Sequence, residues 1–385
     1  MKIGVMVDQI CKGGATKLAI EEVRQLYKEG HDTELLVLYD NGQGLYQDIL
    51  KEVKIRILWY EVPRILRLNV KIPFFSFFSL FHITYIIILP FLIGKKEYDY
   101  VVSHLTYTCF SAYSLSKVRK IPYIAYIHDS ISYILKKVYL KKIGLSVFFY
   151  PIFLFAGVVD RLILRGAFAV CKQSNFESEY LRKIGKKRIY IAPPATYRRR
   201  GTIPGRRGDR LSAFTKWDLS KNFGFLIEIV KHMPISQKLY VAGQWHPKEY
   251  LVKVKGLIAK ENLSNRIVFL SDLNESEIQS FFDNALVLIH PLIEAWGSTL
   301  YEAACNGVTF IAPKGCGIAD FLIGGKDAFY PEQGNLEQYT TYLMKFLNTP
   351  SLAYEMGRQA WLDIKDIDIK YHVQVLLEAM RGERS

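Results

Sequence analysis

Mainly apolar runs recur along the first half of the chain, and helix-length stretches of mixed polarity separate them. The run Lys2–Val7 leads into a glycine turn at Ile10–Ala15, and a helix-length pattern follows over Thr16–Glu29 before Gly30. This order predicts a strand, a turn and a helix, which is how a βαβ unit begins. The further strands expected in this half are Thr33–Tyr39, Tyr100–Ser103, Tyr123–Ile127, Ala167–Cys171 and Ile189–Ala192.

The alternation of strand-like and helix-like segments stops once along the chain and then resumes. Pro193 and Pro194 end it, and residues 196–210 are polar, basic and glycine-containing, which is typical of a linker. Two such alternations joined by a linker predict an α/β protein with two doubly wound, Rossmann-like domains that face each other across a cleft. The strands expected after the linker are Arg210–Thr215, Lys238–Ala242, Arg266–Leu270, Leu286–His290, Val308–Ala312 and Ala328–Tyr330.

These patterns set the expected divisions of the chain. Residues 1–195 form the first domain, 196–210 a basic linker and 211–355 the second domain, while the helical segment 356–385 could pack back on the first domain. A length of 385 residues suits two domains with cores of their own. The five cysteines are scattered without metal-site spacing, which predicts a reducing compartment, and the N-terminus shows no leader typical of a secretory signal.

The net charge of +14 is unevenly distributed. Residues 1–195 carry 28 lysines and arginines against 16 aspartates and glutamates, the linker carries 6 against 1, and residues 211–385 carry 17 against 20. The first half and the linker are therefore expected to meet any anionic surface. One alternative is a basic protein that binds nucleic acid or glucosylates its bases, although the sequence contains no recognition-helix or RNA-binding motif.

Two aromatic segments in the basic half raise the question of a membrane. Phe74–Ile93 is about long enough to cross a bilayer, which takes roughly twenty residues. A crossing there would place Gly13 and His128 on opposite sides of the membrane, so the segment is expected to be an interior helix or a surface helix that dips into lipid. A second run, Val147–Phe155, follows a group of lysines, and this pattern favours peripheral attachment to the cytoplasmic face. The lysines are Lys136, Lys137, Lys141 and Lys142.

The stretch EAWGSTLYE, from Glu294 to Glu302, places two carboxylates on either side of a Gly-Ser-Thr step. A strand-like run precedes it and a helix-compatible run follows it, so we expect a strand-to-helix turn at the sheet edge where α/β proteins bind ligands. Ser298 and Thr299 would present the first N–H groups of the helix. Glu302 has two possible roles, because it could touch a ligand or form a capping box with Thr299.

With these residues laid out, the chain resembles the retaining glycosyltransferases of the GT-B fold, in the large family 4-like group (glycosyl transferases group 1) that uses nucleotide-diphosphate sugars. The resemblance covers most of the chain. It is most specific at Glu294 and Glu302, which have seven residues between them with Gly297 inside, and at Ala303–Gly307, which leads into a strand.

Other positions fit the same family, namely Gly13 and Gly14, His128 after a strand, and Lys216 with Lys221. Lys216 stands where the family usually has arginine, and a lysine supplies the charge without the bidentate fork. This departure leaves a catalytically silent scaffold as another alternative. The two lysines and the N-terminus of the helix after Gly297 could together stabilise a leaving diphosphate, in which case no metal ion is required.

The resemblance implies transfer of a hexose from a nucleotide-diphosphate sugar to a lipid-linked or glycan acceptor, with no cofactor beyond the donor substrate. It assigns catalysis to Glu294, at the hydroxyls of the donor sugar, and to His128, from the first domain. It assigns Glu302 to the ribose of the nucleotide. The expected donor-binding residues are Gly13, Gly14, Lys216, Lys221, Gly297, Ser298, Thr299 and Glu302.

Overall fold

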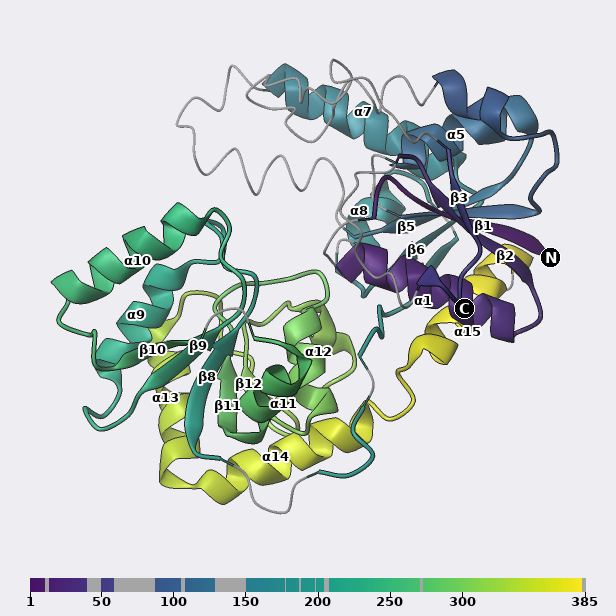
Figure 1. Ribbon diagram of the computed structural model, residues 1–385. Helices are drawn as coiled ribbons and strands as arrows, with labels where there is room; N and C mark the ends of the chain where they lie inside the picture. Colours follow the sequence, from purple (N-terminus) through teal and green to yellow (C-terminus); the bar gives the residue numbers. More distant parts are fainter. Residues whose placement is uncertain are drawn as a thin grey trace. The chain divides into compact units, whose positions relative to one another are not determined.

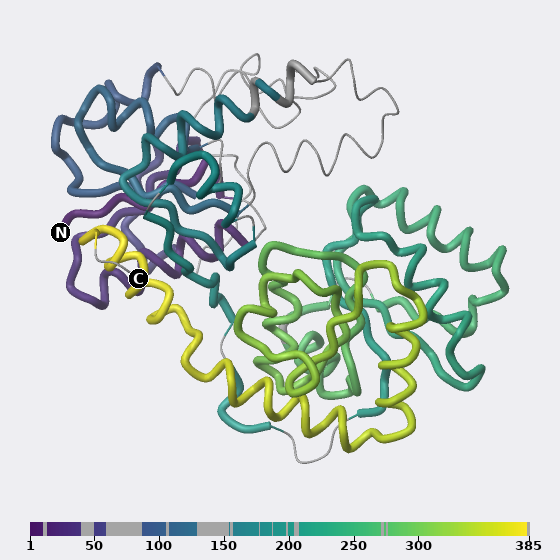
Figure 2. Tube along the Cα trace, turned by 180° about the vertical axis from the view of Figure 1, so that it is seen from behind, coloured from purple at the N-terminus to yellow at the C-terminus, as the bar shows by residue number. Residues whose placement is uncertain are grey.

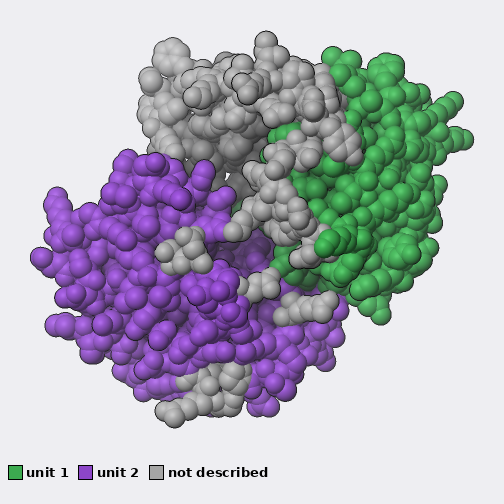
Figure 3. All heavy atoms as spheres, viewed as in Figure 1, with its two compact units in different colours: residues 1–196, 369–385 green, residues 197–368 purple. Residues whose placement is uncertain are grey.

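The structure is a computed structural model in which the chain divides into two compact units (Figure 1 and Figure 3). Unit 1 comprises Met1–Thr196 and Ile369–Ser385, and unit 2 comprises Tyr197–Asp368. The structure describes residues 1–10, 14–39, 50–58, 87–104, 108–128, 150–176, 178–186, 188–197, 199–203, 208–270 and 273–382.

Unit 1 is built on a seven-stranded parallel sheet with the strand order β3-β2-β1-β4-β5-β6-β7. The order reverses between β1 and β4, and in sheets of this kind ligands bind outside the carboxyl ends of the strands at such a point. The strands are β1 (Lys2–Val7), β2 (Asp32–Val37), β3 (Ile55–Ile57), β4 (Tyr100–His104), β5 (Tyr123–Ile127), β6 (Ala169–Lys172) and β7 (Ile189–Ile191). The helices are α1 (Gly14–Lys28), α5 (Thr108–Arg119), α7 (Tyr150–Gly166), α8 (Ser178–Lys183) and α15 (Ile369–Arg381).

The two faces of this sheet carry separate hydrophobic cores, because successive side chains of a strand point to opposite faces. Ile3, Val5 and Val7 pack with residues of α1 and α15 on one face, whereas Met6 packs with residues of α5 and α7 on the other. Helix α15 therefore returns from the far end of the chain to lie against α1, as the yellow and purple segments show in Figure 2.

Unit 2 is built on a five-stranded parallel sheet with the order β10-β9-β8-β11-β12. Its order reverses between β8 and β11, so the loops after these two strands occupy the ligand-binding position of the sheet. The strands are β8 (Arg210–Phe214), β9 (Leu239–Ala242), β10 (Ile267–Leu270), β11 (Ala285–Ile289) and β12 (Thr309–Ile311). The helices are α9 (Phe223–His232), α10 (Lys248–Lys260), α11 (Glu275–Asp283), α12 (Ser298–Cys305), α13 (Leu336–Asn348) and α14 (Pro350–Asp363), with a 3-10 turn at Gly317–Asp320.

The predicted α/β class with two doubly wound sheets is confirmed. The predicted strands appear within two residues of their expected bounds, except for Ala328–Tyr330, which contributes only isolated bridges of Ala328 with Gly324 and of Phe329 with Ile311. Strand β3 was not predicted, because its three residues form too short a run to stand out from the surrounding polar positions.

Residues of the predicted linker pack within unit 2, and the C-terminal segment is divided between the two units. Tyr197 and the residues after it belong to unit 2, where the Arg200 guanidinium lies 2.5 Å from the Asp283 carboxylate and that of Arg199 lies 3.8 Å from the centre of the Trp361 ring. These two positive charges are therefore engaged by their own unit and contribute less to an anionic docking surface than the sequence suggests. Of the segment 356–385, the part up to Asp368, which includes the end of α14, belongs to unit 2, and the part from Ile369, which includes α15, belongs to unit 1.

Much of the two aromatic segments lies outside the described residues. These outside positions are residues 74–86, residues 147–149, Lys136, Lys137, Lys141 and Lys142. At the end of the first segment Leu89 and Ile93 are buried in the core while Ile87 and Phe91 are exposed. In the part of the chain that the structure describes, no helix has both the length and the apolar character to cross a membrane.

Candidate donor-binding site

The loops after β8 and β11 bring together residues that are far apart in the sequence. Strands β8 and β11 are paired in parallel, so the segments that follow them leave the sheet at the same edge. At this edge the Lys221 Nζ donates a hydrogen bond to Oε1 of Glu294, which forms an ion pair across 73 positions of sequence. The structure thereby joins a predicted donor-binding residue to the predicted catalytic carboxylate.

Glu294 sits between two basic side chains. Its carboxylate contacts Lys221, and its Oε1 lies 3.5 Å from the Nε2 of His290, whose ring is buried. Burial raises the pKa of Glu294, but the His290 ring and the Lys221 ammonium group lower it by more, so the pKa lies well below its usual range. With 18% of its side chain exposed, Glu294 is an anion at neutral pH that keeps some access to solvent.

Gly297 explains how helix α12 begins beside this carboxylate. It is the N-cap residue with φ 90°, a left-handed conformation that side chains with a Cβ rarely adopt, and a Cβ there would lie 2.9 Å from Cδ1 of Leu300. Among the described residues, no side chain forms a capping hydrogen bond at the N-terminus of α12. The N–H groups of its first turn, at Ser298 and Thr299, therefore have no acceptor within the helix.

The capping-box interpretation of Glu302 is wrong. Because the N-cap is Gly297, Thr299 is the second helical residue and cannot form the box. Glu302 follows Ser298 by four positions, so both lie on the same side of α12, with Ser298 exposed and Glu302 only 8% exposed. This side of the helix can present a hydroxyl and a carboxylate to one ligand.

Lys216 and Lys221 belong to one bent loop. Trp217, next to Lys216, is fully buried and donates from its Nε1 to the Ala242 carbonyl at 2.9 Å, which fixes the start of the loop. Asp218 accepts from the backbone N–H of Ser220 at 2.7 Å, a side-chain turn that directs the chain toward Lys221. Lys216 is exposed and makes no ion pair within the described residues, so its ammonium group is accessible to a ligand.

Of the two predicted glycines in unit 1, Gly14 opens helix α1 and Gly13 lies outside the described residues. A Cβ added at Gly14 would meet no heavy atom within 4 Å. Crowding among the described residues therefore gives no reason for a glycine at position 14.

His128 directly follows β5 and is half-buried at the carboxyl edge of the unit 1 sheet. Its Nδ1 is hydrogen-bonded to the side chain of Gln173 and not to a neighbouring backbone group. Its Nε2 is buried and has no hydrogen-bond partner among the described residues. Burial, helped by His104, lowers the pKa of His128 to about 3, so the ring is neutral at physiological pH. The neighbouring Asp129 lies outside the described residues.

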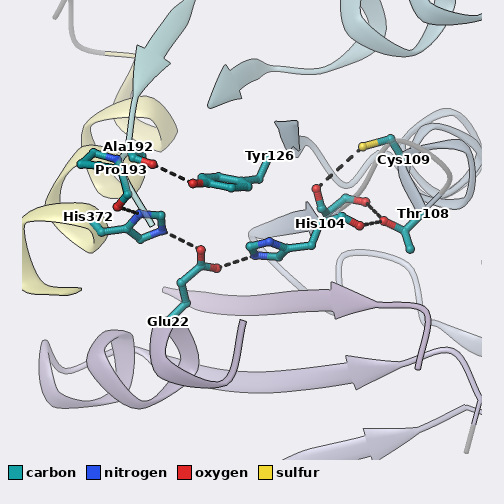
Figure 4. Close-up of polar contacts among 9 residues, drawn as sticks. Glu22, His104, Thr108, Cys109, Tyr126, Ala192, Pro193 and His372 are labelled. Carbon is teal, nitrogen blue, oxygen red and sulfur yellow. Dashed lines mark hydrogen bonds and ion pairs between the residues drawn. The ribbon is translucent and has the colours of Figure 1, made fainter. Parts of the chain in front are cut away.

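A buried polar cluster around Glu22 was not predicted (Figure 4). It includes His104, whose ring centre lies 6.0 Å from that of His128. The Glu22 carboxylate accepts hydrogen bonds from Nε2 of His104 at 2.7 Å and from Nε2 of His372 at 2.6 Å, and all three side chains are fully buried. Burial raises the pKa of Glu22, but His104 and His372 lower it to about 2. The available signal was a glutamate on the apolar stripe of α1, between Leu18 and Leu26.

His372 connects two segments in this cluster. Its Nε2 faces the Glu22 carboxylate at 2.6 Å, and its Nδ1 faces the Pro193 carbonyl at 2.8 Å. Within the described ranges, no group of three or more histidine, cysteine, aspartate or glutamate side chains could hold a metal ion.

Comparison with known proteins covers both units. Residues 216–361 match the family model described as "Glycosyl transferases group 1", and residues 12–196 match the model described as "Glycosyltransferase Family 4". The Bacillus subtilis (strain 168) protein named "Uncharacterized glycosyltransferase YqgM" is 26% identical over 212 residues, a match that spans 52% of this chain and 58% of that protein.

Solved structures share the fold over nearly the whole chain. The Anabaena protein Alr3699/HepE in complex with UDP and glucose has a TM-score of 0.75 at 14% identity and covers 99% of this chain and 100% of its own. A mutant of the S. aureus protein TarM in complex with fondaparinux, alpha-GlcNAc-glycerol and UDP has a TM-score of 0.74 at 12% identity, with coverage of 98% and 99%.

Proposed function

Because the chain belongs to the family 4-like glycosyltransferases of the GT-B fold, we propose that it transfers a hexose from a nucleotide-diphosphate sugar with retention of the anomeric configuration. The acceptor is a glycan or a lipid-linked molecule at the cytoplasmic face of the membrane. No cofactor and no metal ion take part beyond the donor substrate. HepE binds UDP and glucose, and TarM binds UDP and alpha-GlcNAc-glycerol, which supports a nucleotide-sugar donor and a glycan acceptor.

The observation that carries this proposal is the ion pair of Glu294 and Lys221 beside the N-terminus of α12. The ammonium group of Lys221 and the N–H groups of Ser298 and Thr299 are suited to a diphosphate, since cations and helix N-termini both attract phosphate oxygens. The Glu294 carboxylate accepts hydrogen bonds from sugar hydroxyls, which keeps the sugar against the diphosphate. Glu302 holds the ribose.

In the proposed reaction the bond between the anomeric carbon and the phosphate oxygen breaks as the acceptor oxygen bonds to the same face of that carbon. The acceptor proton passes to an oxygen of the departing diphosphate. The protein contributes by stabilising the negative charge that develops on the diphosphate, through Lys216, Lys221 and the start of α12. Glu294 stabilises the positive charge that develops on the sugar.

A panel of nucleotide sugars tests the donor. We expect the melting temperature to rise with one base and one sugar in particular, and the corresponding nucleoside diphosphate to give a smaller rise, since stabilisation follows binding to the folded state. The Glu294→Gln variant should respond to the nucleoside diphosphate but lose the extra rise that the sugar provides. Absence of a response to every nucleotide and nucleotide sugar would overturn the proposal.

Helix α7 supports the membrane part of the proposal. Leu154, Val158 and Leu162 recur at every fourth position, so they share one helix face, and they are 55%, 52% and 53% exposed. An exposed apolar face in the strongly basic half of the chain suits the surface of an anionic bilayer.

Vesicle binding tests this attachment. The wild-type protein should bind vesicles that contain anionic lipid, bind neutral vesicles poorly, and lose affinity as salt is added. Replacing Leu154, Val158 and Leu162 together with serine should lower the partition coefficient about tenfold. A matched control replaces three exposed apolar residues of unit 2, Ile235, Val252 and Leu257, with serine. Equal losses in both variants, or no vesicle binding by the wild-type protein, would contradict peripheral attachment through α7.

A further inference from the structure

His128 and Gln173 directly follow two neighbouring strands of the unit 1 sheet, β5 and β6. Strands β5 and β6 are parallel neighbours, and their register pairs Ile127 with Lys172. The next residue of each strand is therefore His128 on one side and Gln173 on the other, and their side chains form a hydrogen bond between Gln173 Nε2 and His128 Nδ1. The contact follows from the register of the sheet and does not depend on a long loop.

The chemistry of this hydrogen bond determines which nitrogen of His128 carries the proton. An amide nitrogen of glutamine can only donate, so Nδ1 must accept and cannot be protonated. A neutral ring of this kind has its single proton on Nε2. That nitrogen is the buried atom without a partner among the described residues, so the ring holds an unused N–H donor.

The groups around His128 keep its ring neutral. His104 of β4 lies 6.0 Å away and Tyr126 of β5 lies 5.1 Å away, measured between ring centres. Glu22 of α1 would favour a positive ring, but both of its oxygens already accept hydrogen bonds from His104 and His372 (Figure 4). Burial and the two other histidines therefore prevail, which agrees with the lowered pKa of His128.

We propose that Gln173 is a positioning residue that holds His128 as the Nε2–H tautomer, so that His128 donates a hydrogen bond to a substrate oxygen and does not remove a proton from the acceptor. The part of this inference that concerns substrate rests on the proposed function. The tautomer itself is independent of any substrate, so the two parts can fail separately.

The decisive variant is Gln173→Glu, because it keeps the length of the side chain and reverses the polarity of the hydrogen bond. A carboxylate accepts from Nδ1–H, which moves the proton of His128 from Nε2 or leaves the ring doubly protonated. Gln173→Met removes the hydrogen bond at similar size and should leave a mixture of tautomers. Asn175→Asp is the matched control, since it adds the same charge on an exposed residue two positions away.

Nitrogen-15 NMR of histidine-labelled protein reads the tautomer directly, with the His128 signals assigned from the His128→Gln variant. The wild-type and Asn175→Asp proteins should show the Nε2–H pattern from pH 5 to 8, and Gln173→Glu should show Nδ1–H or a doubly protonated ring. A wild-type Nδ1–H pattern, or the same pattern in Gln173→Glu as in the wild type, would overturn the inference.

Kinetics test the functional half. Gln173→Glu and Gln173→Met should lower kcat/KM for transfer by about tenfold, because one hydrogen bond to the substrate is lost. Gln173→Glu should also introduce a pH dependence between pH 5 and 8 that the wild type lacks. If the NMR result holds but kcat/KM does not change, the tautomer stands and the role in transfer is wrong.

Discussion

Unit 2 holds Glu294 between Lys221 and His290, and unit 1 holds Glu22 between His104 and His372. Burial raises the pKa of each carboxyl group, and the two basic partners lower it by more. The settings differ in access, because Glu294 stands on a loop at a sheet edge with 18% of its side chain exposed, while Glu22 is fully buried. The lowered pKa of each of these two carboxyl groups therefore indicates a compensated charge, and the exposure of Glu294 is what distinguishes it from the structural cluster around Glu22.

Replacement by glutamine should impair activity at Glu294 and stability at Glu22. Glu294→Gln keeps the shape of the side chain and removes its charge, and we expect transfer to fall by about a thousandfold, as for loss of a preorganised charge at a reacting centre. Donor turnover measures the effect, and the melting temperature should stay within a few degrees of the wild-type value. A transfer rate near that of the wild type would remove Glu294 from the reaction.

Glu22→Gln should instead damage stability. Removing the carboxylate breaks the buried pairs of Glu22 with His104 and His372, and we expect a loss of about 3 kcal/mol in the free energy of local unfolding. Hydrogen exchange measured by mass spectrometry should place the loss in α1 and α15, because Glu22 joins these helices. Donor binding to unit 2 should stay unchanged, and unaltered exchange in both helices would show that the cluster contributes no net stability.

The same cluster predicts a pH dependence. The pKa of Glu22 in the folded protein, about 2, lies below its ordinary value of 4.5. The stabilisation is therefore complete above about pH 4.5 and is lost as the pH falls toward 2, by about 3 kcal/mol in total. Acid unfolding monitored through α15 should show this loss in the wild type, and a smaller slope is expected for Glu22→Gln. Identical slopes would mean that Glu22 does not govern the acid stability of unit 1.

Lys221→Ala tests the cationic partner in the accessible ion pair of Lys221 with Glu294. We expect about tenfold weaker binding of the nucleoside diphosphate, since one charge-assisted contact to phosphate is lost, and unchanged binding of the nucleoside. Calorimetry measures both affinities. Lys231→Ala is the control, because it removes a surface ion pair of unit 2 with Glu261. Equal losses for nucleoside and diphosphate in Lys221→Ala would refute the phosphate assignment.

Lys216→Arg should have the smallest effect. Lys216 is exposed and without an ion pair among the described residues, so an arginine can take its place without breaking a contact. If the position binds phosphate, the guanidinium fork should keep donor affinity within about threefold or improve it. A collapse of donor binding in the calorimetric titration would show that Lys216 does not occupy the phosphate-contact position.

The strands and the Glu294–Glu302 turn could be predicted from the sequence because they are local. A strand buried on both faces is a short apolar run, and its end indicates where a parallel sheet binds ligands. The capping box could not be rejected in the same way, because only the left-handed conformation of Gly297 shows where α12 begins. Ala328–Tyr330 has the composition of a strand but lacks continuous pairing.

Contacts between distant segments could not be predicted. The pair of Lys221 with Glu294 depends on the alignment of β8 with β11, and the hydrogen bond of His128 with Gln173 depends on the register of β5 with β6. Glu22 and His372 are 350 positions apart. Periodicity within one segment carries no information on such register, so a single charged residue on an apolar stripe was the only sequence signal of the buried cluster.

The stereochemistry of donor turnover tests the central claim most directly. Wild-type protein would be incubated with the donor that the thermal-shift panel identifies and with an acceptor, while proton NMR records the anomeric coupling of the product and phosphorus-31 NMR records the released nucleotide. The account predicts one nucleoside diphosphate released per sugar transferred, with the anomeric configuration of the donor retained. An inverted product, or no nucleotide released by a protein that binds the donor, would contradict it.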